Sequence, residues 1–150
     1  MKRKLRILLV VLSILLLLPA CQSSSETSEA EVTQVIDGDT IVIAGGYHVR
    51  YIGIDTPERD EPYYSEAKNA NQALVEGKVI RLERDTTNKD KYGRLLRYIY
   101  IDKTFINAEI VRQGYAYVYP KDLFPDIKYY DLLKEAEAEA QREERGIWGN

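Results

Sequence analysis

Residues 32–54 read VTQVIDGDTIVIAGGYHVRYIGI, and this stretch carries the strongest indication of fold in the chain. β-branched and aromatic residues recur in three short runs, separated by Asp37-Gly38-Asp39 and by Gly45-Gly46. Runs of this kind, bounded by glycine-containing turns, are typical of antiparallel strands, and a Gly-Gly pair suits a tight hairpin. The stretch therefore predicts three consecutive antiparallel strands at the start of a folded domain.

The chain beyond these strands predicts a mixed domain with two more strands and three helices. Alanines at helical spacing follow Ser65, and Gly77 is a suitable cap for the end of that helix. A helix after the third of five strands is the arrangement of an OB-type barrel. We therefore predict an α+β fold, a five-stranded OB-type β-barrel with three α-helices. The further strands are expected at 78–83 and 95–101, and the helices at 65–75, 107–113 and 126–145.

The first twenty residues have the composition of a signal peptide. Four basic residues precede an apolar run from Ile7 to Leu18, and Ala20 stands just before Cys21. The apolar run is shorter than the roughly twenty residues that a membrane-spanning helix needs. We therefore expect residues 1–20 to direct export and to be removed.

The sequence Leu18-Pro19-Ala20-Cys21 resembles the lipobox of bacterial lipoproteins, in which the cysteine becomes the acylated first residue. Cys21 is the only cysteine, and lipidation would explain a lone thiol in an exported protein. An ordinary cleaved signal, which would release the protein, is the alternative. Residues 21–31 are expected to form a lipidated, flexible tether, and residues 32–150 a single extracytoplasmic domain.

The charge of the expected mature chain limits how it can bind polyanions. Without the first twenty residues, which hold four Lys and Arg and no acid, 17 basic and 24 acidic side chains remain, a net charge of −7. Diffuse adhesion to nucleic acid depends on Lys and Arg neutralising phosphates. A nucleic-acid site in this chain must therefore be locally basic or bridged by a metal ion.

Three clusters combine charged side chains with residues typical of tight turns. Asp39 and Asp55 flank strands of the same meander, so strand pairing can bring their carboxylates together. Oxygen ligands suit calcium, whereas zinc favours His or Cys. Arginine has a planar fork of donors that binds phosphate oxygens in pairs. The clusters are Asp37-Gly38-Asp39-Thr40, Arg50 with Asp55-Thr56-Pro57-Glu58, and Asp90-Lys91-Tyr92-Gly93-Arg94.

The relation between Arg50 and Asp55 depends on the strand that carries them. Strand alternation places two residues five apart on opposite sides, unless a bulge or the end of the strand intervenes. The sequence leaves both arrangements open. A metal, a base and charged clamps are nevertheless the parts that phosphodiester hydrolysis needs.

These clusters resemble the motifs of the staphylococcal (micrococcal) nuclease family. Asp-Gly-Asp-Thr, Arg-(x)4-Asp-Thr-Pro-Glu and Asp-Lys-Tyr-Gly-Arg are followed by Asn107-Ala108-Glu109 and Val111-Arg112-Gln113-Gly114 in the family's order. The likeness covers roughly residues 32–148. It implies a monomeric, calcium-dependent nuclease that cleaves DNA and RNA with little sequence preference and leaves 3′-phosphate products.

The resemblance also implies a role for each matching residue. A stretch that departs from the family is Arg59–Tyr64, which is shorter than the corresponding loop, and the domain is acidic where the prototype is basic. The implied Ca²⁺ ligands are Asp39, Asp55 and Thr56 through its carbonyl; the implied catalytic residues are Arg50, Glu58 and Arg94; and the implied substrate-binding residues are Lys91, Tyr92, Tyr117 and Tyr119.

Other interpretations of the same residues are less specific. An Asp-Gly-Asp sequence is more often a tight turn than a metal site. Tyr117 and Tyr119 share one face of an extended segment, which suits stacking on bases or packing in the domain. For the whole chain, the rival hypotheses are a non-catalytic OB module that binds nucleic acid or protein, and a surface protein with a purely structural calcium ion.

Overall fold

The computed structural model describes residues 27–122 and 126–149. The expected signal peptide, the expected lipidation site Cys21 and most of the expected tether lie outside these residues. Among the helices that are described, none is long and apolar enough to cross a membrane.

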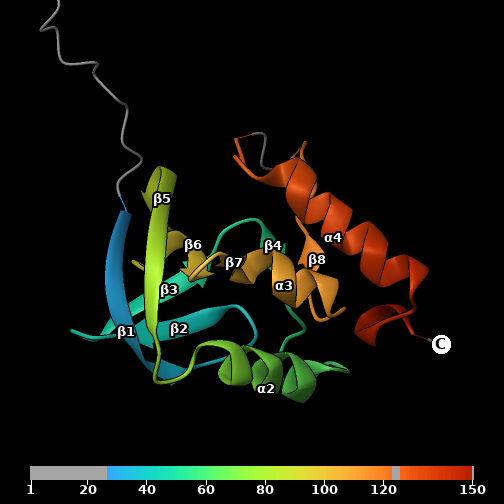
Figure 1. Cartoon of the computed structure of the whole chain (residues 1–150), viewed down its shortest axis with the longest axis horizontal. Coiled ribbons are helices and arrows are strands. Elements are labelled where there is room, and N and C mark those ends of the chain that lie inside the picture. The colour runs from blue at the N-terminus through green and yellow to red at the C-terminus, as the bar shows by residue number, and fades with distance from the viewer. Residues whose placement is uncertain (1–26, 123–125, 150) are drawn as a thin grey trace, which may run out of the picture.

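Five strands close into a barrel (Figure 1). Neighbouring strands follow the order β3-β2-β1-β5-β6 with antiparallel pairing, and a parallel pairing of β3 with β6 closes the barrel. The mixed five-stranded barrel with three helices confirms the predicted α+β OB-type fold. The barrel strands are β1 Thr27–Val35, β2 Thr40–Ile43, β3 Tyr47–Tyr51, β5 Val79–Lys89 and β6 Leu95–Ile101.

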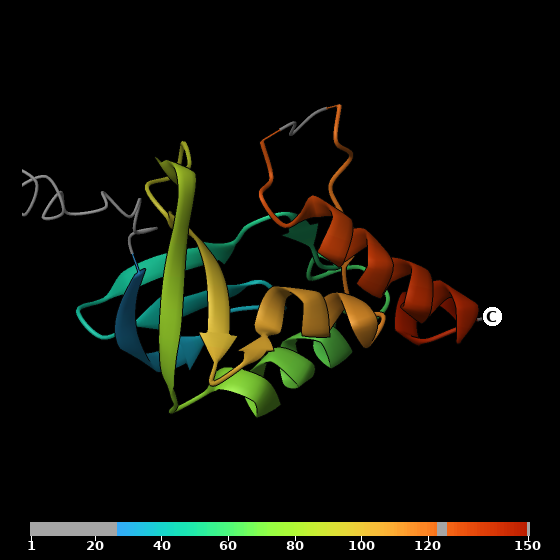
Figure 2. The same cartoon turned by 45° about the horizontal axis from the view of Figure 1, so that its top comes forward.

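The three helices gather on one side of the barrel (Figures 1 and 2). α3 packs between strand β6 and α4, and it also contacts α2. Three two-residue strands and a short 3-10 helix complete the described fold. The helices are α2 Tyr64–Val75, α3 Ile106–Arg112, α4 Tyr130–Arg142 and η1 Gly146–Trp148, and the short strands are β4 Ile54–Asp55, β7 Thr104–Phe105 and β8 Tyr117–Val118.

The hydrophobic core fills the barrel and continues beneath the helices. Ile80 and Leu82 point inward from β5, as the two-residue period of a strand requires. Ile110 and Leu133, from α3 and α4, are fully buried in the same cluster. The core therefore joins the barrel to the C-terminal helices, and it gives rigid support to the loops between them.

Two strands are longer than the sequence predicts. Residues 27–31, expected in the flexible tether, instead belong to β1 and pair with Val79–Glu83 of β5. The sequence predicts a strand that ends at residue 83, yet β5 continues to Lys89, opposite Leu95. Polar residues form strands here because each segment has a neighbouring strand that satisfies its backbone groups.

The last helix is shorter at both ends than its predicted range of 126–145. Its start is delayed to Tyr130 because the backbone N–H of Lys128 donates to the hydroxyl of Tyr98 on β6, which holds the preceding segment outside the helix. At the other end, Glu144 and Gly146 have left-handed backbone conformations, with φ of 51° and 53°. These conformations end the helix and turn the chain back toward α3.

Candidate active site

The turn between β1 and β2 carries two acids and is fixed by an asparagine from α2. The Asp37 side chain accepts a hydrogen bond from the Asp39 backbone N–H at 3.1 Å. The side chain of Asn71 donates to the Asp37 carbonyl at 2.9 Å, and it accepts a bond from the Tyr51 hydroxyl at 2.8 Å. A helix distant in sequence therefore holds this turn in place.

Glycine at position 38 allows the turn to approach Thr56 closely. A Cβ atom at Gly38 would lie 2.7 Å from Cγ2 of Thr56, a distance that real side chains do not tolerate. The close approach brings Asp39 within hydrogen-bonding distance of Thr56. Asp39 Oδ2 accepts bonds from the Thr56 backbone N–H at 2.9 Å and from its hydroxyl at 3.0 Å.

The end of a strand brings Arg50 and Asp55 to the same side. β3 ends at Tyr51, and the chain turns through Gly53, whose φ is 83°, before β4 begins at Ile54. This turn removes the alternation that would otherwise separate the two side chains. The Arg50 guanidinium consequently lies 2.7 Å from Asp55 Oδ1.

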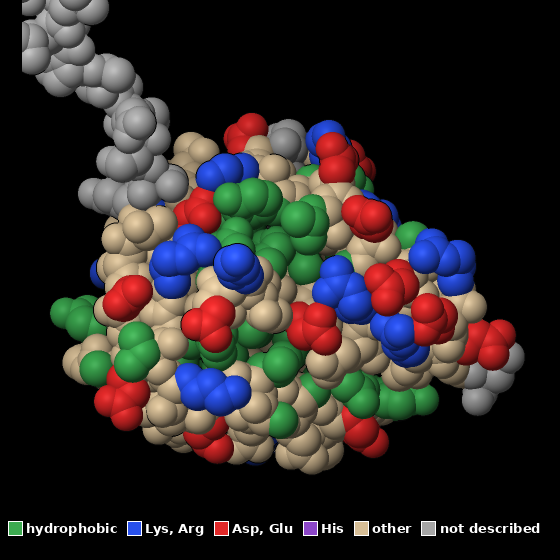
Figure 3. Space-filling view, viewed as in Figure 1, with side chains coloured by type: hydrophobic (Ala, Val, Ile, Leu, Met, Phe, Trp, Pro, Cys, Tyr) green, Lys and Arg blue, Asp and Glu red, His purple; other side chains and the backbone are tan. Residues whose placement is uncertain are grey.

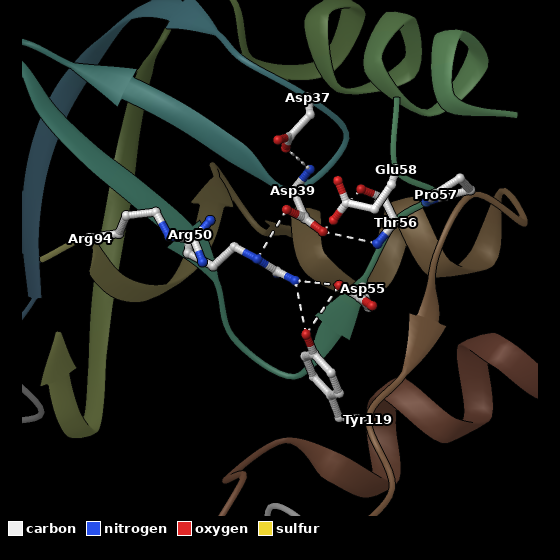
Figure 4. Close-up of a pocket in the computed structure, with 9 residues that line it drawn as sticks. All are labelled: Asp37, Asp39, Arg50, Asp55, Thr56, Pro57, Glu58, Arg94 and Tyr119. Carbon is white, nitrogen blue, oxygen red and sulfur yellow. Dashed lines mark hydrogen bonds and ion pairs between the residues drawn. The ribbon is translucent and has the colours of Figure 1, made fainter. Parts of the chain in front are cut away.

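Arg50 is the centre of the site (Figure 4). Its Nε lies 3.1 Å from Asp39 Oδ1, and one terminal nitrogen donates to Asp55 and, at 3.2 Å, to the Tyr119 hydroxyl. The other terminal nitrogen donates to the backbone carbonyls of Tyr51 at 2.8 Å and Ile54 at 2.7 Å. Arg50 therefore joins the two predicted metal ligands and fixes the β3–β4 turn.

The buried position of Asp39 makes its ionised form costly. Burial raises the pKa of Asp39 to about 6, against the lowering effect of Arg50, and repulsion from Asp37 adds to the rise. Burial likewise raises the pKa of Tyr119, whose hydroxyl donates to Asp55 at 3.1 Å. Tyr119 is therefore a neutral hydrogen-bond donor at neutral pH.

Glu58 and Arg94 complete a small, polar pocket of about 150 Å³. Four carboxylates and two guanidinium groups surround it, so acids outnumber cations. Figure 4 shows Arg94 extending toward Arg50 from one side and Glu58 lying beside Thr56 on the other. The pocket is lined by Asp37, Asp39, Arg50, Asp55, Thr56, Pro57, Glu58, Arg94 and Tyr119.

A tight turn aims Arg94 at the pocket. Asp90 Oδ1 accepts the backbone N–H groups of Tyr92 and Arg94, both at 3.0 Å, and Oδ2 accepts Arg94 Nε at 2.7 Å. Burial tends to raise the pKa of Asp90, but these hydrogen bonds hold it below its usual value. In the described chain neither terminal nitrogen of Arg94 has a hydrogen-bond partner. This fork of donors is available to a phosphate.

The other predicted substrate-binding residues lie at different distances from the pocket. Tyr119 lines it, whereas Tyr117 pairs with Asp55 through the backbone and turns its ring against Trp148, 5.3 Å away. Tyr92 is 73% exposed, with Arg94 above its ring at 5.5 Å and Lys91 at 5.0 Å. The structure therefore brings Tyr119 into the site and leaves Lys91 and Tyr92 on the adjoining surface.

An apolar pocket of about 210 Å³ adjoins the polar one. The two pockets share Arg50, Arg94 and Tyr119. Leu96 and Ile127 supply apolar side chains to the wall of the second pocket. A polar pocket beside an apolar one matches a phosphate with an attached base.

The residues present fit a calcium ion held partly by protein oxygens. Among residues 27–122 and 126–149, no three acid, His or Cys side chains converge into a complete metal site. The predicted set needs only two carboxylates and one carbonyl, because calcium also accepts water. Within the described residues the second oxygen of Asp55 accepts no hydrogen bond, and its side chain is 48% exposed. Together with the excess of acids, this favours binding of a cation.

Sequence reasoning missed two residues of the site. The sequence indicates Asp37 only as part of a motif, yet it lines the pocket and its side chain accepts a hydrogen bond from the Asp39 backbone. Asn71 was not singled out at all, although it is fully buried. An asparagine on the inward face of an alanine-rich helix was the available signal, since a buried amide needs partners.

Comparisons with known proteins find a matching family model and several similar sequences. A family model described as staphylococcal nuclease homologue matches residues 48–150. A thermonuclease of Staphylococcus intermedius is 38% identical over 128 residues, covering 78% of this chain and 74% of that protein. A thermonuclease of Staphylococcus hyicus is 33% identical over 137 residues, covering 85% and 80%. An endonuclease of Bacillus subtilis (strain 168) is 35% identical over 143 residues, covering 87% and 66%.

Proposed function

The chain belongs to the staphylococcal nuclease family, and we propose that this nuclease depends on calcium and hydrolyses both DNA and RNA with little sequence preference, leaving 3′-phosphate products. One observation carries the proposal: the carboxylates of Asp39, Asp55 and Glu58 and the guanidinium groups of Arg50 and Arg94 line a single pocket. Acids for a cation and a base, together with donors for phosphate, are the groups that this reaction needs.

The proposed reaction is attack of water on phosphorus. Glu58, at the rim of the pocket, accepts a proton from the attacking water. As the new bond to phosphorus forms, the bond to the 5′ oxygen breaks, and that oxygen leaves as a hydroxyl group after taking a proton from solvent water. The 3′ oxygen keeps the phosphate.

Charge on the phosphate increases in the transition state, and the pocket has donors placed to meet it. The free terminal nitrogens of Arg94 bind two phosphate oxygens in the bidentate geometry that suits guanidinium. Arg50 adds a second positive charge next to them. Asp39, Asp55 and the Thr56 carbonyl would hold the calcium ion, which would supply further positive charge to this transition state.

The apolar pocket suits the base of a nucleotide whose phosphate occupies the polar pocket. Tyr119 and Leu96 offer surfaces that every base can contact, because each base has an aromatic face. Such contacts carry little sequence information, which agrees with cleavage of varied sequences. Tyr92, exposed beside Arg94, is placed to contact a neighbouring base.

The test is cleavage of single-stranded DNA, duplex DNA and RNA by the purified full chain, with calcium and with a chelator. We expect cleavage with calcium only, and a loss of about 10²- to 10⁴-fold in kcat for Glu58→Ala, the range typical of a lost general base. Glu135→Ala, at an exposed acid of α4, is the matched control and should keep full activity.

A folded wild-type chain that binds nucleic acid in calcium without cutting it would instead support the non-catalytic binding module. Cleavage that is unaffected by the chelator would contradict the proposed dependence on calcium. A calcium-dependent rise in melting temperature without any cleavage would favour a structural calcium ion.

We also propose that the protein is exported and held at the membrane by lipid on Cys21, with simple secretion as the alternative. The lipobox-like sequence Leu18-Pro19-Ala20-Cys21 and the absence of any other cysteine support this placement. An extracytoplasmic nuclease would act on DNA and RNA that are outside the cell.

A further inference from the structure

An ion pair and hydrogen bonds join the segment 127–129, just before α4, to β5 and β6. The Lys128 ammonium lies 2.6 Å from Glu83 Oε1, and the Tyr129 hydroxyl donates to the same oxygen at 2.9 Å. The Lys128 backbone N–H donates to the Tyr98 hydroxyl at 3.0 Å. We call Glu83 and Tyr98, with Lys128 and Tyr129, the clamp.

The clamp is built around a buried charge. Glu83 is only 4% exposed, and its second cation, Arg81, lies 3.6 Å away. The hydrogen bond that Lys128 donates to Glu83 raises the pKa of Lys128. Burying a carboxylate raises the free energy of the fold unless cations and donors lie close to it. Glu83 therefore favours the one position of residues 127–129 in which Lys128 and Tyr129 reach it.

Packed aromatic rings reinforce this position. The Tyr129 ring lies 4.7 Å from that of Tyr98 and 5.3 Å from that of Phe105, edge to face in both cases. Figure 3 shows apolar side chains reaching the surface between β5 and α4, with basic and acidic side chains on either side. Tyr129 is therefore held both by its hydroxyl and by its ring.

The residue that the clamp places is Ile127. Its side chain lines the apolar pocket beside the polar one, together with Tyr119 and Arg94. It also packs on the β3–β4 turn, since a Cβ atom at Gly53 would lie 3.2 Å from Ile127 Cγ2. The Ile127 side chain is apolar, so packing contacts and the positions of its neighbours in the chain together fix where it lies.

We propose that Glu83 and Tyr98 are positioning residues, which act through Lys128 and Tyr129 to hold Ile127 as a wall of the pocket that takes the base next to the cleaved phosphate. This rests on the proposed nuclease function. Neither residue touches the polar pocket. Loss of the clamp therefore weakens binding of substrate and leaves the chemical step intact.

The test compares steady-state kinetics of Glu83→Ala and Glu83→Gln in the full chain, on one single-stranded DNA oligonucleotide in saturating calcium. We expect KM to rise about five- to tenfold for alanine and about twofold for glutamine, which keeps an acceptor, while kcat stays within about twofold. Glu135→Gln, which removes a charge from the exposed face of α4, should leave both constants unchanged.

A double-mutant cycle shows whether Glu83 acts through Ile127. The double variant Glu83→Ala/Ile127→Ala should have the same KM as Ile127→Ala alone, because the single substitution already removes the side chain that Glu83 positions. Additive effects on KM, or a fall in kcat with KM unchanged, would overturn the inference. If Glu83→Ala does not fold, Lys128→Met at an exposed partner takes its place in the cycle, with the same expected result.

The wild-type assay separates the two proposals. A wild-type chain that cleaves nothing contradicts the proposed function. An active wild type with an unchanged KM in the Glu83 and Lys128 variants contradicts the clamp alone.

Discussion

Neutral side chains, as much as the charged ones, set the geometry of the site. Asn71 has no role in the proposed chemistry, but its amide joins the Tyr51 hydroxyl to the Asp37 carbonyl in the interior. Asn107 similarly accepts from the Ile99 backbone at 2.9 Å and donates to the Ile52 carbonyl at 3.0 Å. Each asparagine connects a helix to a turn that carries or supports the pocket.

Replacing Asn71 with alanine should destabilise both the fold and the cation site. The Tyr51 hydroxyl and the Asp37 carbonyl would each lose a buried partner, at a combined cost of about 2–4 kcal/mol in the free energy of unfolding. We also expect weaker calcium binding, because the Asp37–Asp39 turn is no longer held. Urea denaturation and calcium titration by calorimetry measure the two effects.

Asn69→Ala is the matched control, because Asn69 is exposed on the same helix. Its stability should be unchanged or slightly higher, since alanine is the better helix former. Equal losses in the two variants would mean that the buried amide has no special part in holding the turn.

Among the elements, the C-terminal turn packs unusually closely on the end of α3. The Ile147 backbone N–H donates to the Gly114 carbonyl at 2.8 Å, and the Arg145 side chain donates to the Arg112 carbonyl at 2.9 Å. Arg112 in turn pairs with Glu109 of α3 and Glu139 of α4. These contacts fix α4 against the domain, and through α4 they support β8, since Glu137 accepts the Val118 backbone N–H at 2.8 Å.

Glycine at position 114 is required for this packing. A Cβ atom there would lie 2.1 Å from the Arg145 carbonyl oxygen, and the residue also has a φ of +80°. Gly77 has a φ of +70° but nothing within 4 Å of its Cβ position. Alanine at position 77 therefore measures the cost of the left-handed backbone without any steric clash. We expect Gly77→Ala to lose about 1 kcal/mol in unfolding free energy, and Gly114→Ala to lose about 2 kcal/mol more. Similar values in urea denaturation would contradict a close crossing of the two segments.

At the scale of the whole molecule, the acidic surface restricts how the protein can reach a membrane. The expected mature chain carries a net charge of −7, and anionic lipids repel such a surface. The proposed attachment at a membrane therefore relies on the covalent lipid, which contributes about 0.8 kcal/mol per buried CH₂ group.

We expect the wild-type chain in the membrane fraction of a bacterial host, released by detergent and retained in high salt. Cys21→Ser should appear outside the cell or remain unprocessed, and Ser24→Ala should behave as the wild type. Fractionation with immunoblotting measures this. Release of the wild type by high salt alone would contradict lipid attachment.

Local patterns in the sequence were sufficient to predict most of the fold. The signals were the three runs of β-branched and aromatic residues in 32–54, bounded by glycine-containing turns, and the helical spacing of alanines after Ser65. The barrel and its three helices follow from them. The errors lie at the ends of β1, β5 and α4, where a neighbouring segment satisfied the backbone of polar residues or held them out of a helix.

By itself, the sequence determined which chemical groups this protein has: the motif acids, the two arginines and the fold that carries them. Only the tertiary structure decided how they meet. The end of β3 turned Arg50 toward Asp55, Asn71 reached the Asp37 turn from α2, and Glu83 fixed the segment before α4. Periodicity reports burial within one element, whereas these contacts join residues that become neighbours only when separate elements pack together.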